Sequence, residues 1–172
     1  MCLQTGSDRL PQQDARGAHH LAEHCRALTA EQFLQPLEGF GIPSLQQQFN
    51  HVIGAEQYWT SVIRGEYRHE EFDASEDERD QMTIEGLLGW RSEVAAATTA
   101  MLQQASTDWL ATPALFMAWP GKERELQPRH VMMRIITHNF QHRGQIAAMC
   151  RLHGHPVPQG LDFPLGPDPA LD

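Results

Sequence analysis

The stretch HNFQHRGQI, residues 138–146, decides the expected fold of the chain. It belongs to an apolar pattern of helical period that spans residues 128–154. With 100° between successive residues, His138 and His142 fall on the same face as the apolar side chains. A buried imidazole without a partner is costly, so we expect hydrogen bonds or a metal ion to satisfy both rings.

Three further segments show the helical period, at about residues 12–28, 44–65 and 83–105. Residues typical of helix ends flank these segments, and a Thr-x-x-Gln capping box opens a short additional turn between the first two. These boundary residues are Thr29 with Gln32, Ser44, Gly65, Thr83 and Pro128. The sequence therefore predicts four main helices.

The connections between these helices differ in character. Residues 66–82, EYRHEEFDASEDERDQM, are acidic and lack an apolar stripe, so we expect a long solvated crossover. Residues 113–128 hold two short runs around a Pro-Gly turn, which predicts a small hairpin or an irregular loop. The expected fold class is all-α, a four-helix bundle with a long crossover between helices two and three, forming one domain over residues 1–172.

Composition excludes several classes of partner. The chain of 172 residues is 41% hydrophobic and 20% charged, as in ordinary globular proteins. With 13 Lys and Arg against 22 Asp and Glu, its formal net charge is −9, which disfavours nucleic acid. No apolar stretch reaches membrane-spanning length and no basic leader is evident. We therefore expect a cytoplasmic protein with neither membrane nor nucleic acid as a partner.

A metal held by His138 and His142 needs at least one more ligand from another helix. His51, at the margin of the apolar stripe of the second helix, is the best candidate. Glu56 and Asn139 are candidate hydrogen-bond acceptors that would orient the imidazoles.

Two neighbours of the second histidine carry further expectations. For Arg143, three interpretations stay open: a surface residue, a partner for an acid near the site, or an anion anchor for substrate. Gly144 is costly inside a helix, which indicates that another helix approaches closely there.

Other histidines and the cysteines are given structural interpretations. His20 and His24 also stand four apart and match the H-x-x-E-H pattern of inverted zinc peptidases, but they lie off the apolar face and are expected to point mostly to water. Cys2, Cys25 and Cys150 are too few and too scattered for a disulfide framework, so we interpret them as reduced thiols.

The stretches FNHVIGAEQYWTSVIRG, residues 49–65, and THNFQHRGQIAAMCRLHG, residues 137–154, together resemble the DinB-like (DinB/YfiT) family of metalloenzymes. The resemblance covers most of residues 12–155. It implies a four-helix bundle with a long crossover that is often a homodimer. It also implies that His51, His138 and His142 bind a divalent ion such as zinc or nickel, and that the activity is that of a thiol S-transferase, a thiol-dependent isomerase or a hydrolase.

The leading hypothesis is therefore a metal-dependent enzyme that activates a low-molecular-weight thiol or water for attack on a small electrophilic molecule. The alternative is a non-catalytic binding or stress-response bundle whose metal is structural. A third hypothesis is that the histidines only satisfy each other by hydrogen bonding.

Overall fold

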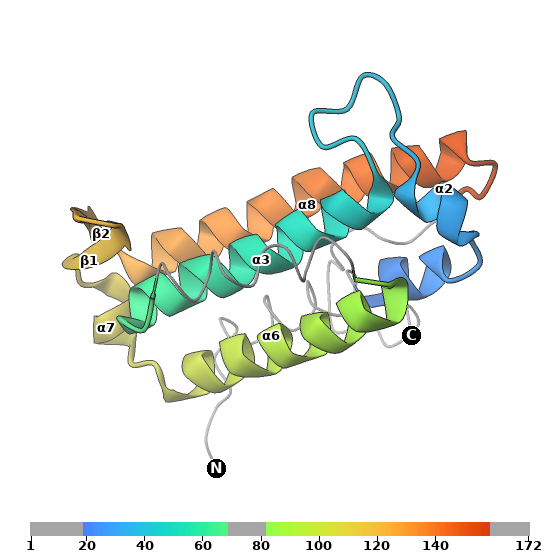
Figure 1. Ribbon diagram of the computed structural model, residues 1–172. Helices are drawn as coiled ribbons and strands as arrows, with labels where there is room; N and C mark the ends of the chain where they lie inside the picture. The colour runs from blue at the N-terminus through green and yellow to red at the C-terminus, as the bar shows by residue number, and fades with distance from the viewer. Residues whose placement is uncertain (1–18, 69–81, 159–172) are drawn as a thin grey trace, which may run out of the picture.

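The computed structural model describes residues 19–68 and 82–158. Three long helices dominate these residues. Figure 1 shows α3 and α8 side by side, and α6 contacts α3. The chain is therefore mostly helical, as predicted. The elements in order are α2 (Ala30–Leu34), α3 (Leu45–Arg64), α6 (Ile84–Gln104), α7 (Thr107–Ala111), β1 (Ala114–Trp119), β2 (Lys122–Leu126) and α8 (Pro128–Leu152).

The capping residues predicted from sequence set the ends of these helices. Thr29 and Gln32 form the reciprocal capping box of α2. At α3 and α6, the side chains of Ser44 and Thr83 each accept a hydrogen bond from a backbone N–H in the first turn. Gly65 ends α3 in the left-handed conformation with φ of 71°, and Pro128 opens α8.

The segment before α8 is a hairpin, the first of the two alternatives expected. Strands β1 and β2 pair antiparallel from Ala114 with Leu126 to Trp119 with Lys122, with an irregularity between Met117 and Trp119. Gly121 supplies the turn with φ of 66°. The inner face of β1 contacts α3, where the Tyr58 hydroxyl donates to the carbonyl of Ala118.

The helix directions explain the length of the acidic connection. In Figure 1, α3 and α6 both begin at the end of the molecule near α2 and run toward the hairpin, while α8 returns in the opposite direction. The chain must therefore span the molecule between α3 and α6, as expected of a crossover. Residues 69–81 of that connection lie outside the described residues, as does the first part of the expected helix 12–28, whose residues 19–25 are helical.

The buried apolar residues form two clusters along the helices. The larger joins the segment 19–25 to α3, α6 and the second half of α8, and the smaller lies toward the hairpin around Ile63 and Ile135. On α8, His138 and His142 stand between Ile135 of the smaller cluster and Ile146 of the larger one. In the described parts of the chain, no helix is long and apolar enough to span a membrane.

Candidate metal site

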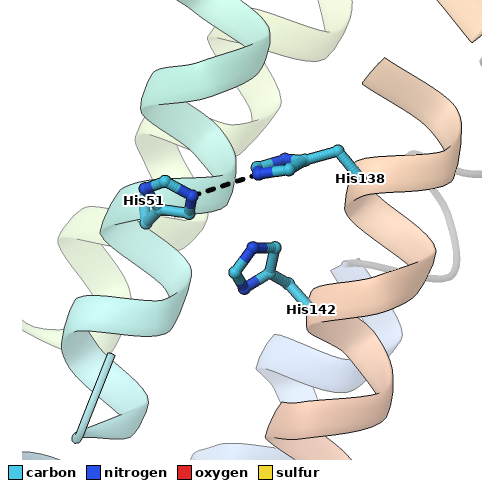
Figure 2. Close-up of side chains that lie close together, drawn as sticks. All are labelled: His51, His138 and His142. Atoms are coloured by element: carbon cyan, nitrogen blue, oxygen red, sulfur yellow. Dashed lines mark hydrogen bonds between the residues drawn. The ribbon is translucent and has the colours of Figure 1, made fainter. Parts of the chain in front are cut away.

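The three histidines predicted to share a metal lie together between α3 and α8. Figure 2 shows the His51 ring of α3 facing the His138 and His142 rings of α8. The ring centroids are 4.9 Å apart for His51 and His138, 4.7 Å for His51 and His142, and 4.5 Å for His138 and His142. One ligand nitrogen from each ring can be chosen so that all three lie within 4.8 Å of one another.

This spacing follows from helix geometry and suits a metal ion. Residues four apart on a helix lie one above the other, so His138 and His142 present a pair of rings to the facing helix. The Nε2 atoms of His51 and His138 are 3.1 Å apart. Two imidazole nitrogens bound tetrahedrally to one zinc ion at about 2.0–2.1 Å lie about 3.3 Å apart. The separation of these two nitrogens is therefore close to the one that two ligands of a single ion require.

A glutamine on α3 fixes the orientation of one ring. His142 Nδ1 lies 2.7 Å from Oε1 of Gln48, and the Nε2 group of Gln48 donates to the carbonyl of Ile42 at 2.8 Å and to Oε1 of Gln145 at 2.9 Å. Because these two donated bonds fix the amide, its oxygen faces the imidazole and accepts the Nδ1 proton. Nε2 of His142 is left as the nitrogen that can bind a metal.

Burial and neighbouring charges keep all three imidazole rings neutral near pH 7. Burial, followed by the like charges of His142, His51 and Arg134, lowers the pKa of His138 to about 4. Partial desolvation also lowers the pKa of His51 and, together with the charge of His51, that of His142. Metal binding needs deprotonated imidazoles, so these shifts leave the lone pairs available at physiological pH.

The cluster is open on one side. His142 is buried, His138 is half-buried and His51 is exposed. The most accessible edge of the cluster is therefore the one that His51 forms. Three neutral ligands on an accessible edge leave room for water or a small molecule at the remaining coordination positions.

Comparison with known families agrees with this arrangement. The model of the DinB family matches residues 1–170. The chain belongs to the DinB family. Comparison with curated proteins gives no match. The predicted relationship is confirmed over nearly the whole length of this DinB-family chain, and its three-histidine cluster fits a metal-binding site.

The structure gives Glu56 a different role from the one predicted. Its carboxylate accepts hydrogen bonds from Thr98 Oγ1 at 2.8 Å, from Asn139 Nδ2 at 3.3 Å and from the guanidinium of Arg91. Glu56 and Arg91 are each about 4% exposed as side chains. The expectation that Glu56 accepts from an imidazole is therefore wrong: its oxygens join α3, α6 and α8 in a buried polar network instead. Asn139 takes part in that network.

The expectations for the neighbours of His142 also change. Arg143 is only 6% exposed, with its guanidinium carbon 4.5 Å from the ring centroid of Phe140, so the surface interpretation is wrong. Gly144 is exposed, and a Cβ there would meet nothing within 4 Å. The close approach predicted at Gly144 is instead found at Gly54 of α3, where a Cβ would lie 3.4 Å from Trp90.

The second histidine pair is partly buried. His20 is exposed, as expected, but His24 stacks on His155 with ring centroids 4.0 Å apart. The pattern H-x-x-E-H at residues 20–24 therefore belongs to a packing contact with the end of α8. The helical wheel missed this contact because it describes one helix and not the chain that folds back over it.

Two side chains that interact with the histidine cluster were not identified from the sequence. Gln48 lies three residues before His51 and is fully buried, so a polar residue on the apolar face one turn from a candidate ligand was the available signal. Arg134 lies one turn before His138, with its guanidinium carbon 5.4 Å from the ring centroid of Trp59. Its positive charge contributes to the lowered pKa of His138, and the sequence carried no comparable signal for it.

Proposed function

We propose that His51, His138 and His142 bind one divalent metal ion and that the protein is a metal-dependent enzyme acting on a small electrophilic molecule. The observation that carries this proposal is the convergence of three imidazoles from two helices, with ligand nitrogens within 4.8 Å, at an edge open to solvent. A site built for stability alone is normally closed by four protein ligands.

A divalent ion supplies Lewis-acid chemistry, which acidifies a water or a thiol in an open position and so provides a nucleophile near neutral pH. The protein side chains would hold this ion and orient the rings that bind it. His138 and His142 form the buried wall of the site, and Gln48 fixes the tautomer of His142. His51 completes the ligand set from the exposed side. Arg134, whose charge lowers the pKa of His138, adds positive charge near the site and favours anionic groups in the bound substrate.

Two other functions make different predictions. A structural site needs a fourth protein ligand, whereas within residues 19–68 and 82–158 the cluster comprises three potential ligands. Histidines that only satisfy each other would bind no ion. The contacts of His51 with His138 and of His142 with Gln48 are compatible with that state. The contact with Gln48 uses Nδ1 of His142, however, so it does not account for Nε2 of the same ring.

The remaining details of the proposal rest on the family resemblance. Zinc or nickel is the proposed ion, because both accept imidazole nitrogen. A low-molecular-weight thiol is the proposed nucleophile for transfer, and water for hydrolysis. We also propose that the protein acts as a homodimer in the cytoplasm.

The test uses protein stripped with a chelator and reloaded with zinc or nickel. Turnover of a panel of electrophiles is measured with and without small thiols. We expect turnover only after reloading, its loss in His51→Ala, and its retention in the control His130→Ala. Both histidines are exposed, so neither substitution should disturb folding.

The outcomes separate the two parts of the proposal. Reloaded wild-type protein that holds one ion per chain but turns over no electrophile would contradict the catalytic part alone. Failure to bind an ion would contradict both parts.

A further inference from the structure

Two cysteines far apart in sequence meet in the core, away from the histidines. Cys25 ends the helical segment 19–25, and Cys150 lies in the last turns of α8. Their Sγ atoms are 3.5 Å apart, and the residues are 1% and 0% exposed. Both are free thiols. Of the three cysteines interpreted as reduced thiols, these two are free and their sulfur atoms are in direct contact, while Cys2 lies outside the described residues.

A second contact holds the same two segments together. The rings of His24 and His155 stack, His24 Nε2 lies 3.2 Å from the carbonyl oxygen of His155, and His155 Nε2 lies 3.1 Å from the carbonyl oxygen of His24. Each residue thus contacts both the ring and the backbone of the other. The two sulfur atoms are therefore held in contact by segments that are packed on each other beside them.

In the part of the chain that the structure describes, the two thiols are not part of a group of three or more potential metal ligands. A structural zinc site needs further ligands, and the one group there of three or more potential ligands is the histidine cluster. A close pair of thiols with no third ligand is suited instead to forming a bond between the two sulfur atoms.

The hydrogen bond between the thiols distinguishes their reactivity. The bond to Cys150, together with burial, raises the pKa of Cys25. The hydrogen bond from Cys25 lowers the pKa of Cys150, although burial opposes this effect. Cys150 is therefore the thiol that loses its proton first, and a thiolate is the reactive form of cysteine.

We propose that Cys25 and Cys150 are a redox-active dithiol that hydrogen peroxide converts into an intramolecular disulfide. The Cys150 thiolate attacks one peroxide oxygen and breaks the O–O bond, which gives a sulfenic acid and releases hydroxide that takes up a proton to form water. The Cys25 sulfur then attacks the sulfenic sulfur. It gives up its proton as hydroxide leaves, and a second water forms.

The balance is two thiols and one hydrogen peroxide giving one disulfide and two waters. The two sulfur atoms together lose two electrons, which reduce the peroxide. Two molecules of a small thiol reduce the disulfide again by exchange through a mixed disulfide, and they leave joined as their own disulfide. Because both sulfur atoms are buried, the oxidant must be small, and hydrogen peroxide meets this requirement.

The disulfide would tie the segment 19–25 to the end of α8. Cys25 and Cys150 are 125 positions apart in sequence, so the bond would close a long loop in the unfolded chain. In the chain-entropy account, a disulfide stabilises the folded state by reducing the entropy of the unfolded chain, and this effect grows with the length of the closed loop. We expect the thermal midpoint of unfolding to rise by about 5–15 °C on oxidation.

The experiment uses the full chain with Cys2→Ser, which leaves Cys25 and Cys150 as its two cysteines. Metal-free protein is treated with a small excess of hydrogen peroxide and then unfolded. We expect loss of both titratable thiols, a monomer on a non-reducing gel and a cross-linked peptide that contains both residues. The thermal midpoint should rise and should return to its starting value after a small thiol is added, which methionine oxidation would not allow.

A matched variant carries Cys2→Ser with Cys25→Ala, so that the same oxidation cannot end in an intramolecular disulfide. It should show no rise in thermal midpoint and should accumulate sulfenic acid that dimedone traps at Cys150. If this variant fails to fold, the peptide map of the Cys2→Ser protein still decides. Two titratable thiols remaining after peroxide treatment, or cross-links only between molecules, would overturn the proposal.

Discussion

Replacing Gln48 with methionine is expected to weaken metal binding by about 10- to 100-fold, the usual effect of removing the hydrogen-bond partner of a metal-binding histidine. Gln48 Oε1 lies 2.7 Å from His142 Nδ1, and the residue is fully buried, so water has no ready access to replace the lost acceptor. Methionine has a similar length and no branch, and so preserves the packing. The substitution thus removes the orienting hydrogen bond while keeping the approximate size of the side chain.

The size of the effect can be compared with the folding cost. A 10- to 100-fold loss of affinity equals about 1.4–2.7 kcal/mol, since each factor of ten is about 1.4 kcal/mol. The same substitution also removes the donor to the carbonyl of Ile42 and to Gln145. Each acceptor left dry costs about 1–3 kcal/mol of folding stability, so affinity and stability must be measured separately.

The assay is a competition titration of zinc between the protein and a chromophoric chelator, at a temperature where each variant is folded. The matched control is Gln57→Met on the same helix, which removes the acceptor of Trp90 Nε1 at 3.1 Å and leaves the hydrogen bond of His142 with Gln48 in place. We expect Gln57→Met to lose stability but bind zinc as wild type does. Wild-type affinity in Gln48→Met, or equal weakening in both variants, would refute the role of Gln48.

Three further predictions concern the titration of His138, the exposed Gly144 of α8 and the buried ion pair of Glu56. In the folded, metal-free protein the pKa of His138 is lowered from its ordinary 6.5 to about 4. As the pH falls, the unfolded chain therefore takes up a proton at this histidine before the folded chain does. The corresponding stability is present above about pH 6.5 and is lost between 6.5 and 4; urea titrations at pH 7 and pH 5 should show a larger loss in wild type than in His138→Ala. Gly144→Ala should raise the free energy of unfolding by about 0.5–1 kcal/mol, because the new Cβ meets nothing. The control Gly54→Ala should gain less because its Cβ meets Trp90 at 3.4 Å, and equal gains would contradict this account. Glu56→Gln should cost about 3–5 kcal/mol in thermal or chemical unfolding by leaving its buried guanidinium partner without a counter-charge; a cost below about 1 kcal/mol would show that the ion pair is not held in the core.

Local chemistry made most of the helices predictable. Ser44, Thr83, Gly65 and Pro128 each act within one turn of a helix end, so their roles follow from neighbouring residues alone. The ligand pair on α8 was predictable for the same reason, because i and i+4 spacing fixes two rings on one face. Sequence reasoning therefore succeeded where the deciding contact lies within a single element.

Contacts between elements were the part that sequence could not fix. Glu56 and Gln48 are both polar residues on the buried face of α3, and nothing in their own helix shows which of them reaches an imidazole. The choice depends on Arg91 of α6, whose charge takes the carboxylate into a separate network. In the same way, the contact of Cys25 with Cys150 arises only when the N-terminal segment packs on the end of α8.

The most direct test of the central claim is a crystal structure of the zinc-loaded protein with anomalous data collected at the zinc absorption edge. The account predicts one anomalous peak per chain, about 2.0–2.1 Å from a nitrogen of each of His51, His138 and His142, with at least one coordination position facing solvent. The absence of such a peak, or a peak bound by other residues, would contradict the proposed metal centre and the chemistry derived from it.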